Sequence, residues 1–74
     1  METEEPVARF DTQQMVDDMA TRGLNKQGLA RRARVSDMTV IRFLRGESQT
    51  HPTARKLASA LGYSVRRYLR KAAA

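Results

Sequence analysis

The side chains in this chain that could do chemistry are mostly cations. Lysine and arginine number 14, against eight aspartates and glutamates and one histidine, and there is no cysteine. No paired carboxylates, no nucleophile with a histidine partner and no phosphate-binding glycine loop can be recognised, so we do not expect an enzyme. With a single histidine and no thiolate, the sequence indicates no metal site, cofactor or small-molecule ligand, and disulfides are excluded.

The positive charge is concentrated in one part of the chain. Residues 1–20 carry six acidic side chains and one arginine, a balance of −5, whereas residues 21–74 carry two acidic side chains and thirteen lysines and arginines, a balance of +11. Such a basic surface attracts polyanions, because it neutralises phosphates and releases their counterions. On charge alone, a nucleic-acid partner and a merely well-solvated surface are equally good interpretations.

The spacing of apolar and capping residues predicts five helices and no strand. The first helix is expected over 12–22, capped by Asp11, with Gln14 at the capping-box position. A short second helix is expected from the cap Asn25 to about Ala33. No alternating apolar pattern of strand length and no internal repeat is present.

Three further helices are expected in the second half of the chain. The third is predicted over 36–45, with Ser36 as its cap. The fourth has Pro52 at its first position and stops at Gly62, and a fifth begins at the cap Ser64. All five helices alternate with short polar or glycine-containing segments, which predicts a compact bundle.

One domain is expected, over residues 11–71. Residues 1–10 contain three glutamates and are expected to form a flexible acidic tail, with a second short tail at 72–74. A chain of 74 residues is long enough for one such domain. Its apolar runs are too short to span a membrane, and its acidic start is unlike a secretory or mitochondrial leader. We therefore expect a cytoplasmic protein.

Two short helices joined by three residues, the second starting at a serine cap, are the layout of a helix-turn-helix. In order and spacing, the chain resembles the lambda repressor and Cro family (XRE-type transcriptional regulators) over about residues 11–70. The matching pieces are LNKQGLA at 24–30, Val35-Ser36, Val40, Arg45-Gly46 and LASALG at 57–62. The resemblance implies an all-α, five-helix, lambda-repressor-like domain. It also implies a sequence-specific double-stranded DNA-binding transcriptional regulator, most simply a repressor, of bacterial or phage origin.

The resemblance further implies that the third helix enters the major groove with its N-terminal residues facing base edges. The base-reading candidates are Asp37, Met38, Thr39, Ile41 and Arg42. Met38 and Ile41 could pack against thymine methyls, although Met38 could also be an ordinary exposed residue. Arg42 could bind guanine O6 and N7 or, almost equally, a phosphate. Asp37 could accept a hydrogen bond from cytosine N4 or only favour the helix N-terminus.

Phosphate contacts are expected from both sides of the reading helix, since helix N-termini and short polar loops present free donors. The phosphate-binding candidates are Asn25, Lys26, Gln27, Ser36, Arg45, Gln49, Thr50 and His51. We expect His51 to flank Pro52 and not to bind a metal. Arg31, Arg32 and Arg34 are expected on the solvent side of the second helix, where they contribute long-range attraction.

The chain departs from the family pattern at three places. Arg34 stands where glycine is usual, and a left-handed arginine there would carry a strain of order 1 kcal/mol. Gly28 lies inside a helix, which costs roughly 0.8 to 1 kcal/mol relative to alanine. Many relatives have a buried arginine–glutamate pair, and here Met19 and Leu44 stand in those positions, an exchange that can be neutral or stabilising.

A homodimer is expected, at least on DNA, because one copy recognises only a few base pairs and a short inverted repeat would present two half-sites. Tyr63, Val65, Tyr68 and Leu69 could supply the dimer contacts, or they could simply close the core. Arg66, Arg67, Arg70 and Lys71 could serve DNA, a partner or solubility. The alternative function is a protein-interaction module, such as an antitoxin or adaptor, on the same helical fold.

Overall fold

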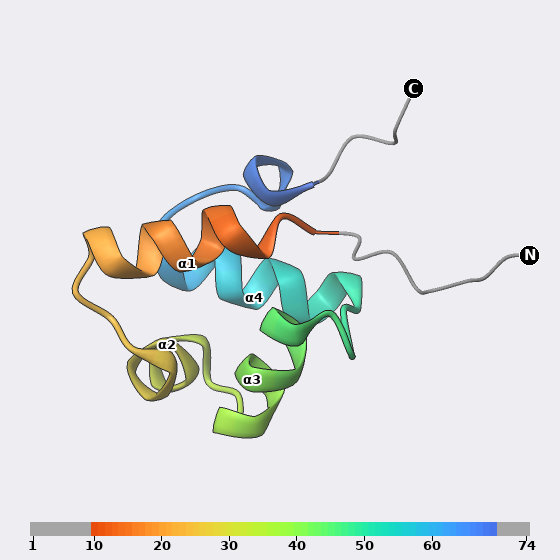
Figure 1. The fold of residues 1–74 in the computed structure, drawn as a ribbon, viewed down its shortest axis with the longest axis horizontal. Coiled ribbons are helices and arrows are strands. Elements are labelled where there is room, and N and C mark those ends of the chain that lie inside the picture. The colour runs from red at the N-terminus through yellow and green to blue at the C-terminus, as the bar shows by residue number, and fades with distance from the viewer. Residues whose placement is uncertain (1–9, 70–74) are drawn as a thin grey trace, which may run out of the picture.

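In the computed structural model, residues 10–69 can be described, and they form an all-helical fold (Figure 1). The elements are α1 (Thr12–Thr21), α2 (Lys26–Ala33), α3 (Asp37–Arg45), α4 (His51–Leu61) and the 3-10 helix η1 (Val65–Tyr68). The predicted all-α class is confirmed, with four α-helices in this part of the chain. The fifth predicted α-helix is instead the four-residue turn η1. The predicted tails, apart from residue 10, and the predictions for Arg70 and Lys71 lie outside the described residues.

Each α-helix begins at a side chain that accepts a hydrogen bond from its first turn. Asp11 caps α1, Asn25 caps α2 and Ser36 caps α3, as the sequence predicts. The fourth cap is Thr50, so Pro52 is the second residue of α4 and not the first. Each cap satisfies an amide that no helical carbonyl can reach.

Gln14 and Gly28, which lie near these caps, have roles that the sequence did not predict. The Asp11 amide donates to the Tyr68 carbonyl, and the Gln14 side chain donates to Asp18 Oδ1 at 3.2 Å, so the reciprocal half of the predicted capping box does not form. A Cβ on Gly28 would lie 3.3 Å from the capping oxygen of Asn25 and 3.2 Å from Leu24 Cδ2. Glycine at this position therefore leaves room for the cap, which offsets part of its cost inside a helix.

The core lies where the four α-helices and η1 meet. Its largest fully buried side chains are Tyr68, Phe10, Phe43, Met15, Leu29, Leu57, Leu61 and Val40. Phe10 corrects the predicted boundary, because it is 1% exposed, with its ring 5.5 Å from that of Phe43, and does not belong to a tail. An isolated antiparallel bridge pairs Phe10 with Leu69, which brings the two ends of the described chain together.

A buried carboxylate, which the sequence did not predict, ties α1 to η1. Asp18 is 5% exposed. It accepts two hydrogen bonds from Arg67, from Nε at 2.8 Å and Nη2 at 3.0 Å, and one from the Tyr68 hydroxyl at 2.6 Å. The Arg67 guanidinium also lies over the Tyr63 ring, 4.1 Å from its centroid. Tyr68 therefore closes the core and supplies no exposed dimer contact.

The turn between α2 and α3 holds a left-handed arginine. Arg34 ends α2 with φ 61° and ψ 45°, and no other non-glycine residue of the described part has a positive φ. The Cβ atom makes this conformation cost about 1–2 kcal/mol. The backbone strain that we expected if Arg34 were left-handed is therefore present.

Replacing Arg34 by glycine is expected to raise the free energy of unfolding by about 1 kcal/mol, because glycine adopts this conformation without the Cβ penalty. Urea unfolding followed by circular dichroism measures the change. Arg34→Ala is the matched control, since it removes the guanidinium but keeps the Cβ. An equal gain in both variants would assign the effect to charge and not to the backbone.

Candidate nucleic-acid interface

Helix α3 presents two different faces. Val40 and Phe43 are completely buried and hold the helix against the core. Met38 and Arg42 lie on its exposed side, and Met38 is 48% exposed. A helical period of 3.6 residues separates these two pairs onto opposite faces.

A shallow depression joins the exposed side of α3 to the start of α2. It has a volume of about 480 Å³ and is lined by Met19, Asn25, Lys26, Gln27, Asp37 and Ile41. Five of these residues are candidates from the sequence, drawn from both the base-reading and the phosphate-binding sets. The sixth, Met19, comes from α1 and was not among the predicted site residues.

Two hydroxyls at the start of α3 are used within the helix cap. Ser36 Oγ accepts from the Thr39 amide at 3.1 Å, and it also shares a hydrogen bond of 2.8 Å with Thr39 Oγ1. Thr39 is only partly exposed. Its hydroxyl therefore takes part in the cap, and its role in reading a base stays a prediction.

The loop between α3 and α4 corrects one predicted phosphate contact. Gln49 is half-buried: its Nε2 donates to the Phe43 carbonyl at 2.9 Å, and its Oε1 accepts from the Phe10 amide at 3.2 Å. Both ends of this amide tie the loop to the core, so Gln49 is a structural residue. The sequence could not show this, because Phe10 is 39 residues away along the chain.

The remaining loop candidates stay at the surface. Arg45 is exposed and lies 3.6 Å from Glu47, a surface pair worth little in solvent. Thr50 is exposed while its hydroxyl caps α4. His51 is exposed, with its ring edge-on to Phe10 at 5.8 Å.

Two cations of this surface have no ion-pair partner among residues 10–69. Neither Lys26 nor Arg42 forms an ion pair with another residue of the described part. Asp37 lies in the first turn of α3, where a carboxylate interacts favourably with the helix dipole. The first backbone amides of α2 lie beside the Lys26 side chain, and no helical carbonyl accepts a hydrogen bond from them.

Within residues 10–69, no three histidine, cysteine, aspartate or glutamate side chains come together as a metal site. No helix in the same residues is long and apolar enough to cross a membrane. The chain matches no family model, no curated protein and no solved structure. Its likeness to the lambda repressor and Cro family therefore stays a prediction from the sequence pattern.

Proposed function

We propose that the chain is a sequence-specific DNA-binding domain, in which α2, residues 34–36 and α3 act as a helix-turn-helix. The observation that supports this most directly is the division of α3 into a buried face and an exposed face. Val40 and Phe43 anchor the helix from beneath, which leaves Met38 and Arg42 projecting outward. A helix anchored on one side can enter the major groove, which is about 12 Å wide.

The proposed contacts follow the chemistry of each side chain. Arg42 is assigned to guanine O6 and N7, and Met38 and Ile41 to thymine methyls. Asp37 either accepts from cytosine N4 or acts only on the helix dipole. Lys26, with the free amides at the start of α2, is assigned to a phosphate on one side of the groove, and Arg45 to the backbone on the other.

In cells the domain would act as a transcriptional regulator, most simply a repressor, that binds a short inverted repeat as a homodimer. Reading helices about 34 Å apart would reach successive major grooves. Of the residues considered for dimer contacts, Tyr63 and Leu69 are exposed, at 36% and 45%. They are therefore the two that stay available for a symmetric contact.

Selection from a random duplex library, followed by titration of the recovered sequence at several salt concentrations, tests this function. We expect an inverted repeat to be enriched, and log K to fall linearly with log salt concentration as phosphate counterions are released. Recovery of no preferred sequence, together with salt-insensitive binding, would contradict the proposal and favour the protein-interaction module.

Two substitutions distinguish recognition of specific bases from non-specific attraction to phosphates. Arg42→Ala is expected to cost about 1 to 3 kcal/mol on the selected duplex and to relax the preference at one base pair. Lys26→Ala is expected to weaken the selected and a scrambled duplex alike, and to reduce the salt slope by about one. Fluorescence anisotropy with both duplexes measures these changes. Equal losses on the two duplexes for Arg42→Ala would remove its reading role.

A further inference from the structure

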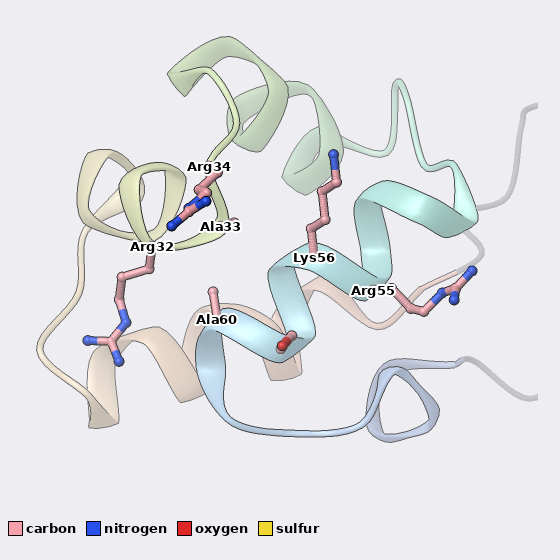
Figure 2. A pocket seen from close by; sticks show the side chains of 7 residues that line it. Arg32, Ala33, Arg34, Arg55, Lys56 and Ala60 are labelled. Atoms are coloured by element: carbon pink, nitrogen blue, oxygen red, sulfur yellow. The ribbon is translucent and has the colours of Figure 1, made fainter.

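A second basic surface lies between α2 and α4. It is an open groove of about 710 Å³, lined by Arg32, Ala33, Arg34, Arg55, Lys56, Ser59 and Ala60. Figure 2 shows Arg32 and Arg55 toward opposite ends of this groove, with Lys56 rising from α4 between Arg34 and Arg55. We call these seven residues the α2–α4 groove.

The α2–α4 groove is separate from the proposed DNA-binding surface. Its residues on α2 come from the last turn and the C-cap, whereas the first turn of α2 lines the depression beside α3. The two sets of lining residues share no member. The groove therefore lies outside the depression that joins α2 to α3.

The groove holds four cations and no carboxylate among its lining residues. None of the four forms an ion pair with another residue of the described part. Cations gathered on one hollow repel one another and create a positive potential that favours an anionic occupant. Ala33 and Ala60 are small, and the Ser59 hydroxyl adds a donor for a carboxylate. The surface therefore fits an acidic peptide segment.

An acidic segment of the same chain is within reach. Residues 1–5 include Glu2, Glu4 and Glu5 and no lysine or arginine. The described chain starts at Phe10, which packs against His51, the first residue of α4. From Phe10, an extended chain reaches roughly 17 Å to Glu5 and roughly 27 Å to Glu2. Along α4, Lys56 lies only about 7.5 Å beyond His51.

We propose that the acidic segment Glu2–Glu5 docks in the α2–α4 groove of its own chain. The glutamates neutralise the groove cations, and the short tether gives them a high effective concentration there. This contact neutralises the positive charge of the groove, which would otherwise attract polyanions as the α3 surface does. Attraction of polyanions is then confined to the α3 side of the domain. Because it involves neither α3 nor DNA, it does not depend on the proposed function.

A spin label on the acidic segment tests this contact. The chain has no cysteine, so Thr3→Cys provides a single site for a nitroxide. We expect the NMR amide signals of Arg34, Lys56 and Ser59 to lose most of their intensity until the label is reduced, independently of protein concentration. Losses centred on Met38 and Arg42, losses spread evenly, or losses that grow with protein concentration would each overturn the proposal.

Two matched charge variants of the labelled protein separate the groove from net charge. Arg55→Gln with Lys56→Gln removes two groove cations, and the signals of Arg34 and Ser59 should recover. Arg31→Gln with Arg66→Gln removes two exposed cations outside the groove, and those signals should stay attenuated. Recovery in both variants would show attraction by net charge alone and would overturn docking in the groove.

Discussion

Val40→Asp is expected to abolish the folded state. Val40 is completely buried on the inner face of α3, so the new carboxylate would lie in the core without a partner. The cost of order 5 kcal/mol or more is comparable to the whole stability of a small domain, which is roughly 0.05–0.15 kcal/mol per residue. Circular dichroism and the dispersion of the NMR spectrum measure the loss.

Arg42→Asp is the control for this prediction. It places the same carboxylate two residues further along α3, on the exposed face, where it stays hydrated. We expect this variant to fold with a stability within about 1 kcal/mol of the parent, because surface changes rarely do more. If both variants unfold, the helix cannot accept a carboxylate at all, and the division into two faces would be wrong.

Asp18→Asn is expected to lower the free energy of unfolding at pH 7 by about 1 to 3 kcal/mol, because it removes the negative charge that strengthens the hydrogen bonds from Arg67 and Tyr68. The hydrogen bonds from Arg67, with smaller contributions from Tyr68 and Gln14, outweigh burial and lower the pKa of Asp18 from 3.8 to about 2. Urea unfolding at pH 7 measures the loss. Asp17→Asn, at an exposed neighbour, should change stability by less than about 0.5 kcal/mol.

The same carboxylate predicts a pH dependence. Because the pKa of Asp18 is lower in the folded state, its contribution is complete well above the unfolded value of 3.8 and is lost progressively as the pH falls toward about 2. The stability difference between the parent and Asp18→Asn should therefore be constant at neutral pH and narrow below about pH 5. The other carboxylates are common to both proteins. Parallel curves down to pH 2 would contradict the role of Asp18.

Local signals in the sequence predicted most of the helical fold. Asp11, Asn25 and Ser36 cap their helices, and Gly46 and Gly62 end theirs in left-handed conformations. Both kinds of signal act over a few residues, so they can be recognised without knowing what packs on the helix. The buried and exposed sides of α3 follow in the same way from helical spacing.

What the sequence did not predict depends on contacts between distant residues. Asp18 and Arg67 are 49 residues apart, and no local pattern marks an exposed-looking aspartate as buried. The length of the fifth helix was overestimated because Ser64 is a good helix cap. In the structure the helical conformation ends at Leu69, which is extended, with φ −74° and ψ 127°, and pairs with Phe10. At the interface, the internal hydrogen bonds of Gln49 were missed for the same reason.

The pairing of Phe10 with Leu69 also determines how this domain can be combined with other chains. The Asp11 amide donates to the Tyr68 carbonyl at 2.6 Å, so the polypeptide enters and leaves the fold at neighbouring points. In Figure 1 these points lie on the opposite side from the start of α3. Adjacent ends suit insertion into a surface loop of a host protein and circular permutation. Either rearrangement would keep the first turn of α3 unobstructed.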